Sequence, residues 1–334
     1  MTGPAADASI SARAALPRIS VLLPIYNGRA TLGRAALSIQ QQSVSDWELI
    51  LLDDGSKDGS FELCRELASQ DDRVRAERHE QNRGLGAAMS SLVQLARGSY
   101  LAVQEQDDFS LPGRLEAEAR VLDEEPRVGL VSGVAEWVDA RGERLRLFPD
   151  LLARGGQYPQ RPADMVRYLM VEQCKIVNAG CMFRREVLGE SVFFDSEARM
   201  SVDWQFFLRL AHRHRVHGLG EIVVQVERDA ERTSLTAQKE LQFAEARRCL
   251  ARMLEDFADD PASPIDRRLY RQALATQLLL EARYYGGLPG VAGHLGALCQ
   301  EPGRVETWRS LAELVGRGFS KLTGRAGGRR GGTP

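Results

Sequence analysis

Residues 47–56 read WELILLDDGS, and this stretch decides the fold class. Its largely apolar first six residues form a β-rich run that stops at Asp53. From about Asp58 to Ser69 a helical pattern follows, with Leu63 and Leu67 on one face. The stretch therefore predicts a strand, a polar turn and a helix in succession.

The same unit recurs along the first half of the chain. We expect further strands at Ile19–Pro24, Val74–Glu77 and Tyr100–Gln104, separated by helices. Short strands that alternate with helices are typical of βαβ units and a mostly parallel sheet. Three of these strands deliver polar residues at their C-terminal ends, where open α/β sheets bind ligands. The sequence therefore predicts an α/β fold with a Rossmann-like, mostly parallel sheet flanked by helices.

The second half is less regular, and it ends in a helical region. A helix is expected from Leu111 with Pro112 at its first position. The next expected elements are a strand at Val128–Val138, a helix at Ala163–Glu172, a strand at Gly180–Phe183 and a helix at Val202–His212. From about Thr236 to Val315 the pattern is helical. We predict four units: a disordered leader at 1–17, an α/β domain at 18–235, a helical C-terminal region at 236–317 and a disordered basic tail at 318–334.

The bulk composition excludes several classes of protein. The 44 basic and 46 acidic side chains of the 334 residues leave a formal charge of −2, so no global field attracts nucleic acid or an anionic membrane. The five cysteines are scattered and have neither zinc-site spacing nor disulfide-scaffold density. No signal peptide or stretch of 18 apolar residues is seen in the sequence. We expect a cytoplasmic protein without a spanning segment and without a nucleic-acid partner.

The acidic run Glu105-Gln106-Asp107-Asp108 ends one of the expected strands. Crowded carboxylates raise one another's pKa unless a cation or hydrogen-bond donors compensate them. Hard oxygen ligands select Mg²⁺ or Mn²⁺, which commonly bridge a diphosphate. The run therefore predicts a metal site. The alternative is that Asp108 or Ser110 caps the next helix.

Two turns at the same edge are candidates for binding a base. Pro24-Ile25-Tyr26-Asn27 directly follows the first strand, so Tyr26 can face a planar ring. Asp53 and Asp54 end the second strand, and one of them could accept a hydrogen bond from a base N–H. The alternative for both segments is a plain turn, because Asn, Asp, Gly and Ser favour turns for local reasons.

These motifs, together with the Asn82-Arg83-Gly84 turn, closely resemble family 2 glycosyltransferases of the GT-A fold in order and spacing. The resemblance extends through residues 178–185, which look like the family's acceptor-side strand, and 201–204, which look like its base motif. It covers about residues 18–236.

The resemblance implies specific roles. Pro24 and Tyr26 would line the base site, Asp54 would bond the base, and Asp107 would bind the metal that bridges the donor diphosphate. Glu105 stands where the family usually has the first Asp of its Asp-x-Asp motif, which implies a ribose or water-mediated metal contact. Asp203 would be the catalytic base.

The chain departs from the family pattern at two further places. Val202 replaces the Glu of the family's Glu-Asp pair, and residues 226–230 lack the His of its Arg-x-His segment. Both departures bear on catalysis, since the first leaves Asp203 as the single carboxylate of the base motif.

The implied function is inverting transfer of a sugar from a nucleoside-diphosphate-sugar donor to an acceptor hydroxyl, in surface polysaccharide or glycan synthesis. Mn²⁺ or Mg²⁺ is the expected cofactor, a UDP-sugar the expected donor, and a glycan or lipid-linked precursor the expected acceptor. By analogy, such an acceptor also implies peripheral contact of the enzyme with the inner membrane face. Two alternatives stay open: a degenerate glycosyltransferase-like binding protein, and a nucleotidyltransferase.

Other residues are weaker candidates. His212, His214 and His217 do not share one helical face, so a solvated helix end is favoured over a metal site. Trp204 is interpreted as a core residue. The basic segment 325–330 is interpreted as a solubilising tail.

Overall fold

The computed structural model describes residues 16–172, 175–198, 200–228, 239–285 and 287–301. The leader predicted at 1–17, apart from its last two residues, lies outside the described residues. So do the end of the helical region, 302–317, and the basic tail, 318–334.

Nine strands of the described chain form one mixed sheet in the order β3-β2-β1-β4-β8-β6-β9-β5, with β7 paired to β6. Their bounds are β1 (Ile19–Ile25), β2 (Trp47–Asp53), β3 (Val74–Arg78), β4 (Tyr100–Val103), β5 (Asp108–Ser110), β6 (Val128–Val138), β7 (Arg144–Phe148), β8 (Cys181–Arg184) and β9 (Arg215–Glu227). The first four strands are parallel to one another. β8 is antiparallel to both β4 and β6, and β6 is parallel to β9. The C-terminal ends of β1, β2, β4, β6 and β9 therefore share one edge of the sheet.

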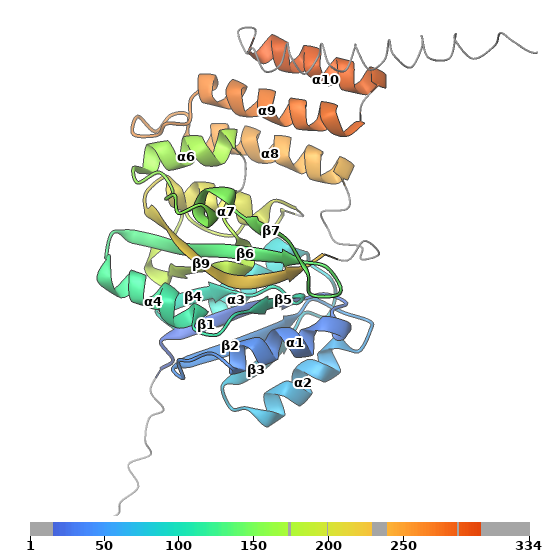
Figure 1. Ribbon diagram of the computed structural model, residues 1–334, viewed down its shortest axis with the longest axis vertical. Coiled ribbons are helices and arrows are strands. Elements are labelled where there is room, and N and C mark those ends of the chain that lie inside the picture. The colour runs from blue at the N-terminus through green and yellow to red at the C-terminus, as the bar shows by residue number, and fades with distance from the viewer. Residues whose placement is uncertain (1–15, 173–174, 199, 229–238, 286, 302–334) are drawn as a thin grey trace, which may run out of the picture.

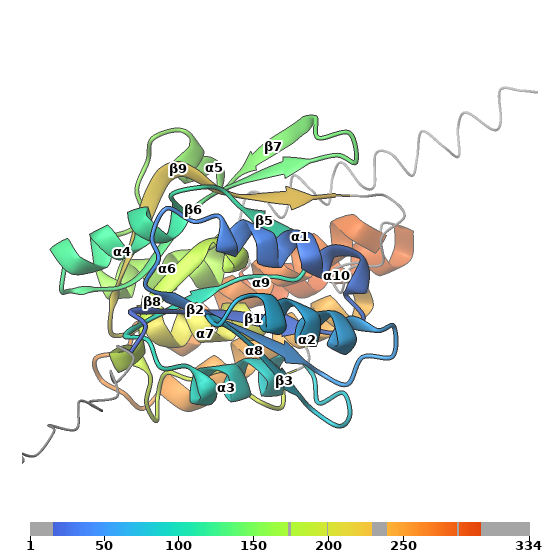
Figure 2. The same ribbon diagram turned by 90° about the horizontal axis from the view of Figure 1, so that it is seen from below.

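Helices cover both faces of the sheet (Figures 1 and 2). On one face α1 (Arg29–Gln40), α2 (Ser60–Gln70) and α4 (Arg114–Glu124) bury residues such as Leu32, Cys64 and Leu122 against the strands. On the other face α3 (Leu85–Leu95), α6 (Pro162–Val171) and α7 (Val202–Ala211) form a second core. Shorter elements complete this part: α5 (Asp150–Ala153), η1 (Asn178–Gly180) and η2 (Arg185–Val187).

The C-terminal helices stack beyond α6 and α7 (Figure 1). They are α8 (Lys239–Phe257), α9 (Arg267–Tyr285) and α10 (Gly287–Gln300). Cys249 and Met253 of α8 and Leu269 of α9 are buried in the same apolar cluster as α7 and the strands. The helical region thus extends one core, and the division at 235/236 stays a prediction of where the family domain ends. No helix in the described ranges is long and apolar enough to cross a membrane.

Most elements of the first half lie within two residues of their predicted bounds, and Val128–Val138 is a strand as expected. The helix predicted from Leu111 is present as α4, but its predicted start, with Pro112 at the first position, was wrong. Residues 111–113 form a turn with Gly113 at φ +82°, and α4 begins at Arg114. The parallel arrangement holds for β1 to β4, whereas the second half is mixed. The strands β5, β7 and β9 were not anticipated.

Candidate active site

The turns that follow β1 and β2 are joined by side-chain hydrogen bonds. The Asn27 N–H donates to Ser56 Oγ at 2.9 Å, and the Lys57 N–H donates to Asn27 Oδ1 at 3.0 Å. Asn27 lies at φ +49°, a left-handed conformation that Asn tolerates better than most residues. The Gly28 N–H donates to Ser60 Oγ at 3.0 Å. Two polar turns far apart in the sequence therefore form one surface.

Asp54, predicted to bond the base, lies in this surface with 3% of its area exposed. Its carboxylate accepts the main-chain N–H of Arg83 at 3.0 Å and of Gly84 at 2.8 Å. His79 Nδ1 lies 2.7 Å from Asp54 Oδ1, and His79 Nε2 lies 3.0 Å from Ser91 Oγ. Because a carboxylate can only accept, Nδ1 of His79 carries the proton. Asp54 thus anchors the 82–84 turn, and a base N–H would share its carboxylate with these donors. Its predicted role stays a prediction.

Tyr26, predicted to line the base site, is 46% exposed, and Pro24 is half-buried beside it. The side-chain amide of Gln106 forms two hydrogen bonds with the main chain of Tyr26. The Tyr26 N–H donates to Gln106 Oε1 at 2.9 Å, and Gln106 Nε2 donates to the Tyr26 carbonyl at 3.3 Å. A Cβ at Gly28 would lie 2.3 Å from Gln106 Oε1. A side chain at Gly28 would therefore make the Gln106 side chain shift.

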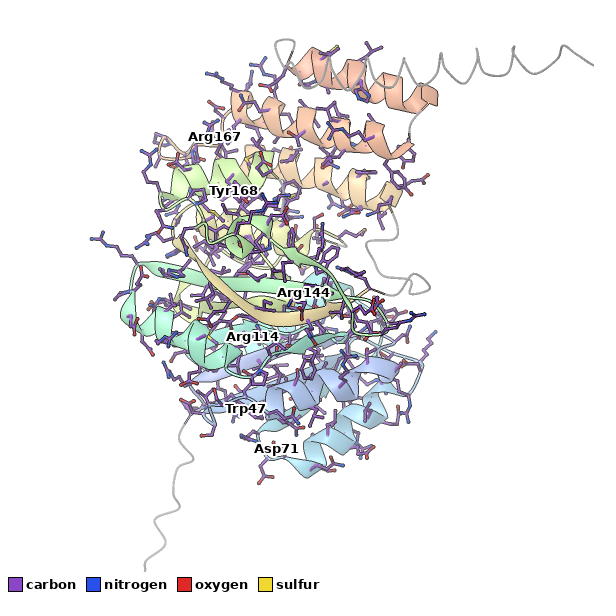
Figure 3. All side chains as sticks on the ribbon, viewed as in Figure 1. Trp47, Asp71, Arg114, Arg144, Arg167 and Tyr168 are labelled. Carbon is purple, nitrogen blue, oxygen red and sulfur yellow. The ribbon has the colours of Figure 1, made fainter. Side chains whose placement is uncertain are left out.

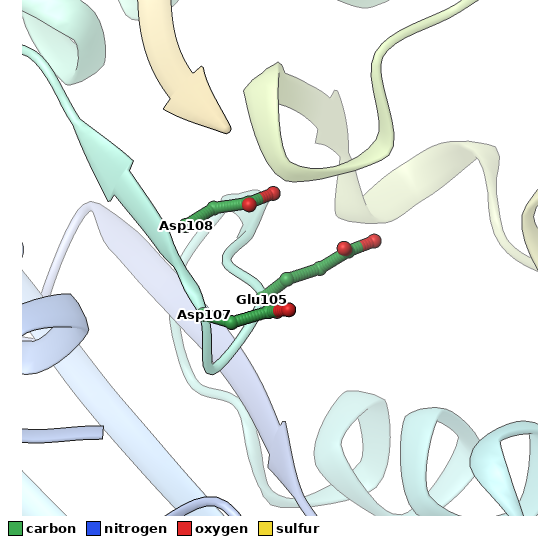
Figure 4. A group of neighbouring side chains, drawn as sticks. All are labelled: Glu105, Asp107 and Asp108. Carbon is green, nitrogen blue, oxygen red and sulfur yellow. The ribbon is translucent and has the colours of Figure 1, made fainter. Parts of the chain in front are cut away.

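The acidic run lies between β4 and β5, and its carboxylates point the same way (Figure 4). Glu105, Asp107 and Asp108 each offer an oxygen within 4.8 Å of the others. The helix-cap alternative was wrong, because Asp108 and Ser110 lie in β5 while Gly113 precedes α4 without any side-chain cap. Within the described residues, these three carboxylates form the one group of acidic, His or Cys side chains that lie close enough together to hold a metal ion.

The pKa of Glu105 depends on the charged residues that surround the acidic run. Burial first, and then the charge of Asp107, raise the pKa of the Glu105 carboxyl to about 7, although Asn178 Nδ2 donates to it at 2.8 Å. The charge of Asp203 raises this pKa further, and that of Arg228 lowers it. The structure therefore brings Asp203 and Arg228, both distant in sequence, into electrostatic range of the acidic run.

Asp203, the predicted base, lies in the first turn of α7, half-buried. Ser201, just before the helix, has φ +56°. Trp204 is buried and donates from Nε1 to the Leu169 carbonyl at 2.9 Å, so its interpretation as a core residue is confirmed. Of the nearby carboxylates, Asp195 is buried and paired with Arg252 at 2.7 Å, and Glu197 is exposed.

Asn178 and Arg228 are site residues whose roles the sequence did not reveal. The Arg228 N–H donates to the Val138 carbonyl at 2.8 Å, and its guanidinium lies 4.2 Å over the Trp137 ring. Nε of Arg228 is buried and has no hydrogen-bond partner within the described part of the chain. The available signal was the resemblance, since Arg228 lies in residues 226–230, the segment that corresponds to the family's Arg-x-His segment. The rest of the predicted loop, 229–230, lies outside the described residues.

The three histidines form no site. His212 stacks on Phe257 with ring centroids 4.5 Å apart, and burial lowers its pKa. His217 Nδ1 lies 3.2 Å from Glu125. The histidines thus do not gather into a metal site, but the expected solvated helix end was wrong, because the His212 side chain is only 3% exposed and His217 lies in β9.

The carboxylate cluster fits the divalent cation that the resemblance implies. All of its donors are oxygens, which Mg²⁺ and Mn²⁺ prefer, and they already converge. The raised pKa of Glu105 means that its charged form lacks compensation here, and a cation would supply it. Asp107 and Asp108 with Glu105 are the residues that would hold such an ion.

The chain is similar in sequence to proteins named as glycosyltransferases. EpsE of Bacillus subtilis (strain 168), provisionally named as a glycosyltransferase, is 34% identical over 146 residues, which is 42% of this chain and 52% of EpsE. An uncharacterized glycosyltransferase of Haemophilus influenzae is 32% identical over 132 residues, 40% of this chain and 52% of that protein. The matched part of the chain thus spans about half the length of these relatives.

Solved structures show the same fold. TarS 1-349 of S. aureus in complex with UDP-GlcNAc has a TM-score of 0.61 at 15% identity, covering 90% of this chain and 92% of that chain. The mannosyltransferase PcManGT of Pyrobaculum calidifontis in complex with GDP-Man and Mn²⁺ has a TM-score of 0.53 at 18% identity, covering 92% of this chain and 88% of that chain. The sequence pattern of glycosyl transferase family 2 matches residues 20–191, from β1 to the segment before α7. Since this match takes in half of the sequence, the chain belongs to glycosyl transferase family 2 and has the GT-A fold.

Proposed function

We propose that this protein is an inverting, metal-dependent glycosyltransferase that moves a sugar from a nucleoside-diphosphate-sugar donor to an acceptor hydroxyl. The observation that carries the proposal is the convergence of three carboxylates at the sheet edge with Asp203 in electrostatic range of Glu105. Inverting transfer needs this combination, a site for the departing diphosphate and one carboxylate that accepts a proton.

The donor side comprises the β1 and β2 turns and the acidic run. Pro24 and Tyr26 are proposed to line the base and Asp54 to bond it, while Asp107 holds the cation and Glu105 makes a ribose or water-mediated metal contact. A bound divalent cation neutralises charge on the departing diphosphate. Arg228, whose Nε is unpaired in the described chain, is a further donor for diphosphate oxygens.

The acceptor side is proposed to comprise Asp203 at the start of α7. Its carboxylate takes the proton of the acceptor hydroxyl as that oxygen attacks the anomeric carbon. Asn178 donates a hydrogen bond to Glu105 at 2.8 Å and so links η1 to the acidic run.

The substrates are proposed from the relatives and their chemistry. We propose a UDP-sugar donor and a glycan or lipid-linked acceptor in surface polysaccharide synthesis, in the cytoplasm. A shared fold leaves the nucleotide open, since solved structures of this fold hold UDP-GlcNAc in one case and GDP-Man with Mn²⁺ in another.

Release of free nucleoside diphosphate from a panel of UDP- and GDP-sugars, with Mn²⁺, with Mg²⁺ and with chelator, tests the proposal. We expect release from at least one donor and its loss on chelation. A protein that binds the donor without releasing diphosphate would be the degenerate binding protein, and release of pyrophosphate from nucleoside triphosphates would indicate a nucleotidyltransferase.

Calorimetry on Asp107→Ala tests the metal site. We expect loss of the Mn²⁺-dependent tightening of nucleoside diphosphate binding, because the ligand that bridges ion and protein is gone. Asp72→Ala is the matched control, an exposed aspartate far from the edge. Equal metal dependence in the two variants contradicts the assignment.

A further inference from the structure

Gln104, the residue after β4, has no exposed surface and lies inside the loop that carries the acidic run. Its side-chain Nε2 donates to the main-chain carbonyl of Glu105 at 3.1 Å and to that of Asp108 at 2.8 Å. One amide group therefore spans the loop from its first carboxylate residue to its last.

The oxygen of the same amide also has two hydrogen-bond partners. Gln104 Oε1 accepts from Ser110 Oγ at 2.6 Å and from Arg114 Nη1 at 3.1 Å. Since Arg114 can only donate, it fixes which end of the amide faces the loop. Gln104 consequently uses both amide ends, and its donors face the carbonyls of the acidic run.

Arg114 anchors this amide to the rigid part of the molecule. It is the first residue of α4 and is 1% exposed (Figure 3). Its Nη2 donates to the carbonyls of Val103 in β4 at 2.8 Å and Cys181 in β8 at 3.2 Å. Its Nε pairs with buried Glu118 at 3.1 Å. The loop is thus fastened through Gln104 to two strands and a helix.

We propose that Gln104 is a positioning residue for the cation and diphosphate, acting through the main chain of the acidic loop. This rests on the proposed function. Three carboxylates within 4.8 Å repel one another, and a loop free to spread would have to be gathered at each binding event. The Gln104 amide keeps the loop closed beforehand, so that binding does not spend free energy on ordering it.

Electron paramagnetic resonance of Mn²⁺ titrated into the full chain, with UDP and in parallel with GDP, tests this role. We expect Gln104→Met to need about 10-fold or more Mn²⁺ for half-saturation, the scale seen when a group that orients metal ligands is removed. We further expect that added Mn²⁺ restores nucleotide binding, because the carboxylates themselves remain.

Gln42→Met is the matched control. Gln42 is also a buried glutamine whose Nε2 donates to two carbonyls, of Ser38 at 3.0 Å and Leu111 at 2.9 Å, outside the acidic loop. The Gln42→Met variant should unfold more easily than the wild type and keep the wild-type Mn²⁺ requirement. If Gln104→Met fails to fold, Gln104→Asn replaces it. Asn keeps an amide that is too short to reach the loop carbonyls and Arg114 together, and a several-fold higher Mn²⁺ requirement is expected.

The outcomes separate the two proposals. A wild type whose nucleotide binding does not respond to Mn²⁺ overturns the proposed function and the role of Gln104 with it. A metal-responsive wild type in which the Gln104 and Gln42 variants share one Mn²⁺ requirement overturns the role of Gln104 alone.

Discussion

At the scale of single residues, Asp203 carries the clearest chemical prediction. Asp203→Asn keeps the shape of the side chain but cannot accept the acceptor's proton. Transfer at saturating donor and acceptor should fall by about 10²-fold or more, the usual scale of general base catalysis. Donor nucleotide affinity, measured by calorimetry, should be nearly unchanged, because the turns proposed to bind the nucleotide follow β1 and β2. Glu197→Gln, an exposed neighbour, is the control, and activity near the wild type in Asp203→Asn would move the search to Asp195 and Glu197.

Gly28 makes a second prediction at this scale. An Ala Cβ would lie 2.3 Å from Gln106 Oε1, so Gln106 must release the main chain of Tyr26. Gly28→Ala should therefore weaken nucleoside diphosphate binding several-fold, since losing one hydrogen bond costs about 0.5–1.5 kcal/mol. Gly33→Ala, within the helix α1 that follows Gly28, meets nothing within 4 Å and should bind like the wild type. Equal affinities of the two variants would show that the Gln106 contact does not shape the nucleotide site.

At the scale of elements, Glu48 of β2 ties together the edge of the sheet opposite the active site. It is 1% exposed and accepts from Ser20 of β1 at 2.6 Å, and from the main-chain N–H of Arg97 at 2.8 Å and its Nε at 2.9 Å. Burial tends to raise the pKa of Glu48, but these hydrogen bonds outweigh burial and lower it from its ordinary value of 4.5. The folded state thus holds the charged form more tightly than the unfolded state does.

The sign of the pH dependence follows from this lowered pKa. The stabilisation is complete above pH 4.5 and is lost as the pH falls through the lower folded-state pKa. Glu48→Gln should cost about 1–3 kcal/mol of unfolding free energy at pH 7. In urea titrations its difference from the wild type should shrink below pH 4.5. Glu77→Gln, which removes a partly exposed partner of Arg75, should cost at most about 1 kcal/mol. A constant difference for Glu48→Gln across this range would contradict the argument.

At the scale of the whole molecule, the C-terminal helices are expected to unfold together with the sheet. Met253 of α8 is fully buried in the cluster that contains α7 and the strands, and ion pairs join Arg209 to Asp256 and Arg252 to Asp195. Met253→Ala should cost about 2–5 kcal/mol. The unfolding transition followed by tryptophan fluorescence and the one followed by circular dichroism should shift by the same amount in this variant. Two separate transitions, of which Met253→Ala moves only one, would show an independent helical domain, and exposed Glu255→Ala is the control.

What the sequence determined by itself was local. Alternating strands and helices, and the polar residues that end the strands, are encoded within segments of about ten residues, so β1 to β4, their helices and the family could be inferred from them. The positions of the acidic run and of Asp203 were also legible, because their chemistry is visible in the residue types.

Only the tertiary structure decided how those residues are held. β9 contains Gly218 and Gly220, which hid its strand pattern, and it exists because long-range pairing with β6 overrides local preference. That pairing brings Arg228 to Glu105, and α7 packing brings Asp203 there. Likewise, Asp54 alone suggested either a turn or a base contact, and its bonds to Arg83 and Gly84 depend on the neighbouring strand. Contacts between residues far apart in the chain cost loop entropy that only the folded core offsets, and for that reason no local pattern announces them.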